Sequence, residues 1–372
     1  MSFIPFELER WQSTWENRVS FNLSESGVHP LTIDELLRIT DTHRDELADV
    51  RLGYSQADGT EPLREEIAKL YQGATAENVI VTVGSSEANF VSTWTLLEPG
   101  DHVAILSPLY RQTWGLAQNF GAKVSTFELK PELEWEPDVD EIARAIVPGT
   151  KLVIVTNPNN PTGHVLSNNA RAEILARTEA AGAWLLADEI YLGAELSGQT
   201  TETFWGSYEK TVAVNGLSKA YALPGLRIGW LVAPAEFKEA LWSRHDYTVI
   251  SPASASDFLA TRALRVRDKI LARTRAILNE NYPILDSWLR QFGPAVNWWR
   301  PDCGAISFVQ YKQAIASLDL AERIKQENDV LIEPGEHFGF ERSIRFGYGN
   351  EIAEFKRALD VLTPAFKKYL MD

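Results

Sequence analysis

The spacing of apolar and polar positions changes along the chain, and each change predicts an element. Short runs of mostly apolar residues recur between residues 78 and 232, without the strict alternation of a half-exposed strand. Such runs are typical of strands that are covered on both faces, as in parallel sheets. The seven strands predicted in this way are residues 78–84, 102–107, 123–129, 151–157, 184–189, 211–216 and 227–232.

Helical spacing marks segments between these strands. We predict helices in residues 86–98, 111–121 and 168–182. The third segment ends at Gly182, which favours a C-cap because glycine adopts the left-handed conformation without a side-chain clash. Strands that alternate with helices predict an α/β fold with a doubly wound, mostly parallel seven-stranded sheet and helices on both faces.

The last third of the chain has a different pattern. Residues 253–291 contain good helix formers and little glycine or proline, so they predict helices. Strands are then predicted at 305–311, 330–335 and 343–349, followed by a helix at 351–370. This order indicates an α+β unit. The first 50 residues predict helices and loops.

The length of the chain supports two domains. It has 372 residues, and ~150 residues per domain is a useful prior. We expect a large α/β domain over residues 45–255 and a smaller α+β domain built from residues 1–44 and 256–372. A chain of this length buries enough surface to fold without a disulfide or a metal.

Charge and cysteine content exclude several classes of protein. The formal net charge is -15 at pH 7, which argues against nucleic acid or an anionic membrane as the main partner. The single Cys303 excludes a disulfide framework and a multi-cysteine zinc site, and the scattered histidines predict no metal site. The chain starts without a signal-peptide pattern and contains no apolar run of about 18 residues. We therefore expect a cytoplasmic protein, and an enzyme.

Several common catalytic motifs are absent. The chain contains no G-x-G-x-x-G after a strand, no G-x-x-x-x-G-K-[ST], no H-E-x-x-H and no G-x-S-x-G. Ser207 and Lys210 match S-x-x-K, but no K-T-G or S-D-N accompanies them, so we interpret the match as coincidence. These absences argue against P-loop, zinc-protease and α/β-hydrolase chemistry.

Polar residues gather where the predicted strands end. Ser85 and Ser86 follow Gly84 at the start of a helix, where backbone N–H groups and hydroxyls can bind an anion. Taken alone, either serine is better explained as a helix cap. The turn at 156–163 contains two prolines and three asparagines, so it can hold an amide in a fixed position.

Two strand ends carry charged residues. Asp188 ends a strand of the buried type, where a carboxylate is costly to desolvate unless a cation pairs with it; it either caps a helix or partners a protonated ring nitrogen. Lys219 follows another strand among apolar residues. Desolvation lowers the pKa of a lysine and makes it a nucleophile toward carbonyls, although a lone lysine is more often solvated. Arg227 can clamp a phosphate.

Together these segments resemble fold-type I pyridoxal-phosphate enzymes, and among them the class I and II aminotransferases. The resemblance runs from about residue 20 to the C-terminus. It implies a fold-type I PLP-transferase-like architecture, pyridoxal 5'-phosphate as cofactor, and Lys219 as the Schiff-base lysine that also moves the substrate proton. It implies that Asp188 keeps the ring nitrogen protonated. Tyr191 and Asn160 match the residues that bind the ring oxygen, and Tyr110 matches the aromatic residue that stacks on the ring.

The same resemblance assigns the rest of the site. Arg345 matches the arginine that binds the substrate α-carboxylate, and Gly27 matches a backbone position near that carboxylate; Asn160 lies in the same subsite. Tyr54 matches a tyrosine that reaches the cofactor phosphate of a neighbouring subunit, which implies a homodimer with shared sites. The family's phosphate-binding residues match Ser85, Ser86, Ser218 and Arg227.

Gly216 departs from the family pattern, which usually has Ser or Thr three residues before the lysine, so one phosphate ligand is missing. A narrower similarity, in the runs SESGVHP, GSSEA, LSKAYALPGLR and RHDYTVISP, links the chain to capreomycidine synthase and related arginine-modifying enzymes. It implies that His29 contacts the substrate; alternatively, His29 caps the helix near Thr32. Arg111 either meets an acidic substrate group or is a solvated helix residue.

The leading hypothesis is an aminotransferase that moves an amino group between an L-amino acid and a 2-oxo acid. The alternative is a lyase, cyclase or oxidase that acts on an amino acid with the same cofactor. A non-enzymatic binding module is disfavoured, because Lys219, Asp188 and Arg345 are all present. The substrate is not predicted, because the side chains that select it follow no readable code.

Overall fold

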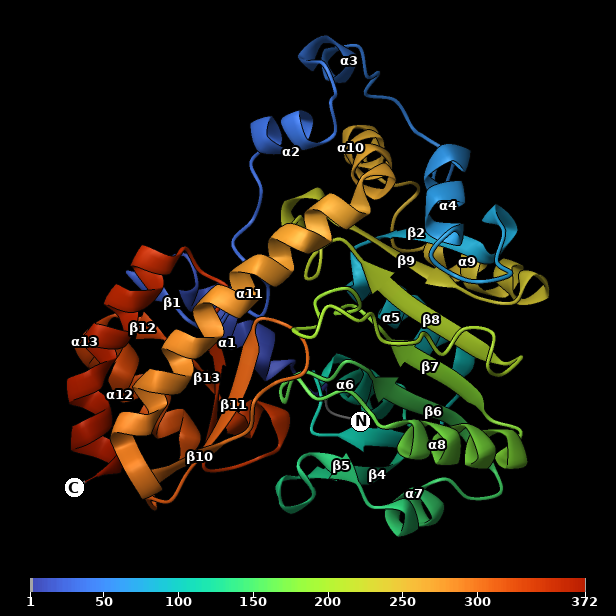
Figure 1. Ribbon diagram of the computed structural model, residues 1–372. Helices are drawn as coiled ribbons and strands as arrows, with labels where there is room; N and C mark the ends of the chain where they lie inside the picture. The colour runs from blue at the N-terminus through green and yellow to red at the C-terminus, as the bar shows by residue number, and fades with distance from the viewer. Residues whose placement is uncertain (1–2, 372) are drawn as a thin grey trace.

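A large, mostly parallel sheet lies in the right-hand half of the molecule in Figure 1. The computed structural model describes residues 3–371. The sheet has the strand order β2-β9-β8-β7-β6-β3-β4-β5. Neighbours from β8 to β4 are parallel, whereas β9 is antiparallel to β8 and β2, and β5 is antiparallel to β4. The strands are β2 (Val79–Val83), β3 (His102–Ser107), β4 (Lys123–Lys130), β5 (Glu136–Pro137), β6 (Thr150–Thr156), β7 (Trp184–Asp188), β8 (Thr211–Gly216) and β9 (Ile228–Val232).

The seven strands predicted for this sheet are confirmed, and so is the α/β architecture. The structure adds β5 at the edge of the sheet. This strand has two residues, which are too few to produce a recognisable apolar pattern. The sheet therefore has eight strands where the pattern predicted seven.

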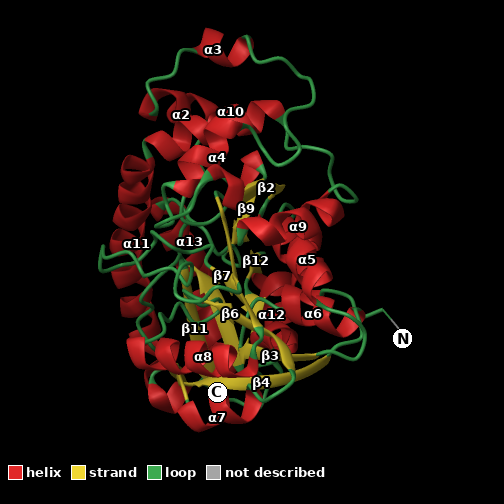
Figure 2. Cartoon of the chain, turned by 90° about the vertical axis from the view of Figure 1, so that its right-hand side faces the viewer, coloured by secondary structure: helices red, strands yellow, loops and turns green. Residues whose placement is uncertain are grey.

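Helices cover both faces of this sheet (Figure 2). Val103 and Ile105 of β3 pack into one helical layer, and Ala104 and Leu106 into the other, as the two-residue period of a strand requires. Gly182, at φ 64°, confirms the predicted C-cap. The first layer contains α5 (Ser85–Leu96), α6 (Gln112–Asn119) and α9 (Lys238–His245), and the second contains α7 (Val139–Ala145) and α8 (Asn168–Ala181).

A four-stranded antiparallel sheet lies beside the large one, in the order β10-β11-β14-β13. The predicted strand at 330–335 is divided into β12 and β13, and β12 pairs with the unpredicted β1. The strands are β1 (Phe21–Asn22), β10 (Val296–Trp298), β11 (Ile306–Tyr311), β12 (Val330–Leu331), β13 (Glu333–Pro334) and β14 (Ser343–Gly347). The helices are α1 (Glu7–Trp15), α2 (Ile33–Ile39), α3 (Arg44–Ala48), α4 (Glu61–Ala68), α10 (Ser254–Arg265), α11 (Arg267–Leu289), α12 (Ser317–Asn328) and α13 (Ile352–Leu370).

The long helix α11 crosses from the small sheet toward α10, which packs on α4 (Figure 1). Asp257 of α10 accepts hydrogen bonds from the backbone N–H and the hydroxyl of Thr60, just before α4. These elements confirm the predicted helices in 253–291, whereas the domain boundaries stay a prediction. Within residues 3–371, no helix combines the length and the apolar composition that a membrane crossing requires.

Candidate active site

Loops at the carboxyl ends of the parallel strands surround a cavity of about 460 Å³. In open α/β sheets these ends meet at one edge, which is where ligands bind. The N-terminal helix α1 and strand β14 close the cavity from the side of the small sheet. The predicted site residues that line it are Ser85, Ser86, Tyr110, Asn160, Asp188, Tyr191, Ser218, Lys219, Arg227 and Arg345.

Asp188 lies at the end of β7 with a buried carboxylate. Its Oδ2 accepts a hydrogen bond of 2.8 Å from Nδ2 of Asn89, and its Oδ1 accepts one of 3.2 Å from the backbone N–H of Ile190. Burial raises the pKa of Asp188, and the Asn89 amide opposes that shift. No ion pair within residues 3–371 involves this carboxylate, so its partners in the chain are neutral donors.

The start of α5 and the Arg227 side chain form an anion-binding corner. Gly84 precedes α5 at φ 77°, and a Cβ there would come within 2.4 Å of Nη2 of Arg227. Nη1 of Arg227 donates to the carbonyl of Pro224 at 3.0 Å, and it lies 3.5 Å from Oγ of Ser218. The guanidinium is thereby held against the helix N-terminus, whose N–H groups favour an anion.

The structure explains why Gly216 departs from the family pattern. A Cβ at this position would lie 3.0 Å from Cα of Gly229 and 3.0 Å from the carbonyl oxygen of Ile228, both on the adjacent part of β9. Real Cβ atoms rarely approach other atoms so closely, because interiors are already packed to high density. A Ser or Thr would therefore require β8 and β9 to move apart by a few tenths of an ångström.

Arg345 is a buried arginine on β14, aimed at the cavity from the side of the small sheet. Its Nη1 donates to Oδ1 of Asn160 at 2.8 Å, and its Nη2 donates to the carbonyl of Ser24. Its Nε has no hydrogen-bond partner among the described residues. A buried donor without a partner is costly, so this guanidinium is suited to receive a carboxylate.

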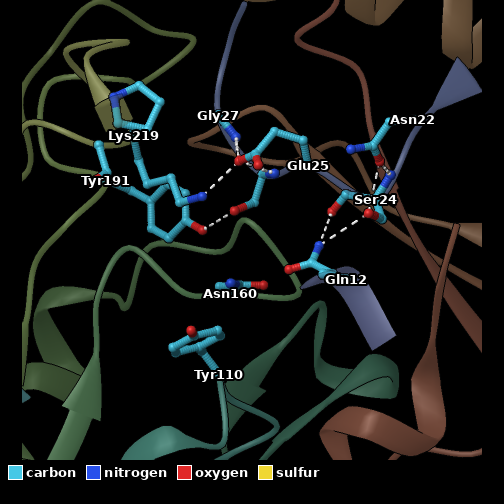
Figure 3. A network of polar contacts seen from close by, with 12 residues as sticks. Gln12, Asn22, Ser24, Glu25, Gly27, Tyr110, Asn160, Tyr191 and Lys219 are labelled. Carbon is cyan, nitrogen blue, oxygen red and sulfur yellow. Dashed lines mark hydrogen bonds and ion pairs between the residues drawn. The ribbon is translucent and has the colours of Figure 1, made fainter. Parts of the chain in front are cut away.

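Two tyrosines line the cavity on different sides (Figure 3). Tyr191 donates from its hydroxyl to Oγ of Ser26 at 2.9 Å. Tyr110 donates to Glu9 of α1, and the ring of Phe6 packs edge-on against its ring at 4.9 Å between centroids. Burial raises the pKa of both tyrosines, so both hydroxyls stay protonated at neutral pH.

The Lys219 amine has a partner that the sequence analysis missed. Its Nζ lies 2.6 Å from Oε1 of Glu25, in the loop after β1 (Figure 3). Burial lowers the pKa of Lys219, but Glu25 and Tyr191 raise it, and the net shift is upward. The expectation of a lowered pKa from desolvation is therefore wrong for this arrangement, because the Glu25 carboxylate, whose side chain is 44% exposed, compensates for the lost water at Lys219.

Three further cavity residues lie on one face of α1 and its ends, and none was predicted. Glu9, Gln12 and Glu16 line the cavity at helical spacing, together with Phe6. The helical spacing of these polar residues is visible in the sequence. Only the folded chain places them in the same cavity as Lys219. Asn89 was also missed, although it lies one helical turn after Ser85.

Four residues that the sequence analysis considered for the site do not line the cavity: Gly27, His29, Tyr54 and Arg111. Gly27 lies beside it: its N–H donates to Glu25 at 3.0 Å, and a Cβ there would lie 3.6 Å from Cδ of Lys219. Tyr54 is 84% exposed. Arg111 is half-buried and lies over the ring of Trp114, at 4.5 Å from its centroid, so both interpretations of its role stay predictions.

His29 is held away from the cavity by its own partners. Its Nδ1 lies 2.9 Å from Nη2 of Arg273 and 3.0 Å from Oε1 of Glu351. The alternative that His29 caps the next helix is wrong, because the Thr32 side chain accepts from the backbone N–H of Glu35 and forms that cap. The imidazole does not line the cavity, and a contact with the substrate stays a prediction.

These side chains fit pyridoxal 5'-phosphate, the cofactor that the resemblance implies. The buried Asp188 has only neutral partners within the described chain, which suits a protonated ring nitrogen. The corner at Gly84 and Arg227 suits a phosphate. Lys219 lies in the same cavity as both groups. The set therefore offers one partner for each polar end of the cofactor.

Comparison with known proteins extends these observations. The family described as Aminotransferase class I and II matches residues 28–362. Capreomycidine synthase from Streptomyces vinaceus is 28% identical over 358 residues, which cover 96% of this chain and 92% of that protein. A PLP-dependent aminotransferase from Streptococcus suis 89-1591 has a TM-score of 0.93 at 31% identity, with 99% of both chains covered. The PLP-dependent cyclase OrfR has a TM-score of 0.92 at 28% identity, with 99% of this chain and 98% of that chain covered.

Proposed function

Because the chain belongs to the aminotransferase class I and II family, we propose that it is a pyridoxal-phosphate-dependent aminotransferase that moves an amino group between an L-amino acid and a 2-oxo acid. One observation carries the proposal: Lys219, Asp188 and Arg345 line a single cavity. A nucleophilic amine, a buried carboxylate and a carboxylate-binding guanidinium are the three groups that the reaction needs from the protein.

Each of these groups has a separate task. When bound, the cofactor supplies an aldehyde and an electron-withdrawing ring. Ser85, Ser86, Ser218 and Arg227 would hold its phosphate together with the N-terminus of α5. Asp188 would hold the proton on the ring nitrogen, with Asn89 keeping the carboxylate ionised.

Substrate binding and proton transfer fall to other residues. Arg345 would bind the α-carboxylate with its unpartnered Nε and an adjacent Nη, since that edge of the guanidinium donates in parallel. Lys219 would take the proton from the substrate Cα with its Nζ. In amino-group transfer the same nitrogen would deliver the proton to C4′ of the cofactor. Tyr191 and Asn160 would hold the ring oxygen, and Tyr110 would pack on the ring.

A second function uses the same site. Elimination or cyclisation of an amino acid also begins with proton removal at Cα and needs no 2-oxo acid. The similarity to capreomycidine synthase and to the cyclase OrfR, both across most of the chain, specifically favours this alternative. The two functions differ in whether the amino group remains on the protein-bound cofactor.

The test compares half-reactions. The holoenzyme is mixed with single L-amino acids, and absorbance and released oxo acid are recorded. For an aminotransferase we expect a stable spectral change with one equivalent of oxo acid, and turnover only after a 2-oxo acid is added. Repeated turnover without an oxo acid would instead support the cyclase or lyase.

Lys219→Ala should abolish both the absorbance of the bound cofactor and the reaction; unchanged colour and activity would contradict the whole assignment.

The same proposal includes a homodimer. Leu52, Tyr54, Tyr247 and Ile250 are large apolar or aromatic side chains that are 62% to 88% exposed. Two hydrogen bonds hold their loops together: Ser55 Oγ donates to the carbonyl of Pro252, and Ser254 Oγ donates to that of Gly53. An exposed patch of this kind is typical of a subunit interface, and it contains the tyrosine expected to reach a neighbouring site.

A further inference from the structure

The ion pair between Lys219 and Glu25 is more ordered than a typical surface pair. Oε1 of Glu25 lies 2.6 Å from Nζ of Lys219. The same oxygen accepts the backbone N–H of Ser26 at 2.9 Å and that of Gly27 at 3.0 Å. Three donors therefore converge on one carboxylate oxygen, which fixes the Glu25 side chain in place (Figure 3).

We propose that Glu25 is a positioning residue for Lys219: its carboxylate holds the free amine as an ammonium ion against the Ser26–Gly27 turn and so sets the pH at which the amine becomes a nucleophile. The inference rests on the proposed function, because it concerns the lysine that is assigned to the cofactor aldehyde. It adds a residue 194 positions away in the chain, which the motif around the lysine does not contain.

The charged and titratable groups that line the cavity with Nζ come from several elements. Glu9 lies on α1, Glu16 at the end of α1, and Glu25 in the loop after β1. Asp188 ends β7, Tyr191 lies in the loop after it, and Arg345 lies on β14. Tyr110 lies before α6, and Arg227 lies before β9. The Tyr191 hydroxyl donates a hydrogen bond to Oγ of Ser26, and Nη1 of Arg345 donates one to Oδ1 of Asn160. Glu25 is the carboxylate that contacts the amine directly, whereas Glu16 lines the same cavity without such a contact.

The sign of the effect follows from these contacts. Lys219 and the turn N–H of Gly27 lower the pKa of Glu25 to about 2, so this carboxylate is charged throughout the neutral range. It opposes the effects of burial and of Arg345, both of which lower the pKa of Lys219. Glu25→Gln removes the charge and keeps the side-chain shape. The pKa of Lys219 then falls, and each unit of decrease raises the neutral amine fraction about tenfold below that pKa.

The experiment measures the amine itself. The purified full chain, freed of bound cofactor by dialysis against hydroxylamine, is treated with trace acetic anhydride from neutral to strongly alkaline pH. The amine nitrogen bonds to the carbonyl carbon, acetate leaves, and the proton passes to solvent. Peptide mass spectrometry then gives the acetylation rate of Lys219 alone. We expect Glu25→Gln to raise that rate about tenfold near neutral pH and to move the pH profile down by about one unit.

Two further variants keep the test decisive. Glu16→Gln removes a carboxylate from the same cavity that makes no contact with Nζ, so its profile should shift much less. Glu25→Asp shortens the side chain and retains the charge, so its profile should lie between those of the wild type and Glu25→Gln. Circular dichroism reports whether each variant folds. If Glu25→Gln does not fold, Glu25→Asp replaces it in the comparison.

Either of two results overturns the proposal. One is an unchanged Lys219 profile in folded Glu25→Gln or Glu25→Asp; the other is a Glu16→Gln shift as large as that of Glu25→Gln. Acetylation requires neither cofactor nor amino acid, so these outcomes are independent of the aminotransferase assay. A protein without amino-group transfer but with the expected profiles contradicts the proposed function alone.

Discussion

At the scale of the residue, two opposing effects act on Asp188. Burial raises its pKa, because a carboxylate loses hydration at the end of a strand. The Asn89 amide lowers it through a hydrogen bond of 2.8 Å. The ionisation of the Asp188 carboxyl therefore depends on the Asn89 amide as well as on burial.

Asn89→Ala tests this dependence. We expect the pKa of Asp188 to rise further, so that more of the carboxyl is protonated at neutral pH and cofactor affinity falls about tenfold, which corresponds to ~1.4 kcal/mol. Affinity should recover as the pH rises and the carboxyl ionises. Absorbance titration with pyridoxal 5'-phosphate measures the dissociation constant. Ser92→Ala is the control, since it removes a buried hydroxyl of α5 that has no hydrogen-bond partner among the described residues; an equal loss there would contradict the assignment.

Lys219 shows where residue-scale prediction from sequence stops. Its place after a strand was correctly expected from the local apolar pattern, and its side chain is 25% exposed in the structure. Its pKa was not correctly expected, since Glu25 comes from a loop that precedes the entire large sheet. A carboxylate 2.6 Å away outweighs the desolvation that the surrounding apolar residues suggested.

At the scale of the element, the N-terminus of α5 is the clearest case of sequence and structure in agreement. Gly84, Ser85 and Ser86 were predicted to open a helix after a strand, and α5 begins at Ser85. Arg227 was named as a phosphate-binding residue, but its packing was not predicted: its Nη2 occupies the space that a Cβ of Gly84 would need. The helix and the arginine form one anion site only because β9 lies beside β2.

Gly84→Ala tests that geometry. A Cβ would approach Nη2 of Arg227 to 2.4 Å at a φ of 77°, so the guanidinium must move away from the helix. We expect cofactor affinity to fall about tenfold or more, because an Arg–phosphate contact is charge-assisted. Gly182→Ala is the matched control: its φ is also positive, at 64°, and nothing lies within 4 Å of the added Cβ. It should lower stability by about 1 kcal/mol and leave the affinity unchanged; equal affinity loss in both variants would contradict the prediction.

Helix α1 is the element whose role was not predicted. Its buried Leu8 and Trp11 face the core, and Glu9, Gln12 and Glu16 line the cavity. The sequence indicated a helix or loop in this region and no more. The face of α1 that meets the cavity depends on the path of the chain after the helix. That path leads into β1, which pairs with β12.

At the scale of the whole molecule, the exposed patch around Leu52 and Tyr54 is the surface through which we propose that two copies of the chain associate. Their loop is tied to the segment 247–254, so the two exposed regions form one surface. The formal net charge of -15 makes two copies repel each other, so the proposed interface would depend on burial of this apolar surface.

Leu52→Asp tests the dimer. The side chain is 88% exposed in the single chain, so a charge there should not affect folding of the subunit. If the patch is the interface, light scattering should report half the wild-type mass, and cofactor affinity should fall because Tyr54 no longer reaches a neighbouring site. Leu133→Asp is the control, at a side chain that is 45% exposed and outside this patch. A Leu52→Asp protein with unchanged mass would contradict the proposed interface.

The sequence by itself determined seven of the eight strands of the large sheet and the residues that follow them. These follow from local apolar pattern, and strands that are parallel bring their carboxyl ends to one edge without further information. Ten predicted site residues, Ser85, Ser86, Tyr110, Asn160, Asp188, Tyr191, Ser218, Lys219, Arg227 and Arg345, indeed line one cavity.

Only the tertiary structure decided which partners these residues have. Asn89 on Asp188, Glu25 on Lys219 and the face of α1 toward Tyr110 all depend on contacts between distant segments. Such contacts depend on the packing of whole elements, and no local period encodes them. They also decide the charge of each group, because burial and a single neighbour at hydrogen-bond distance move a pKa in opposite directions.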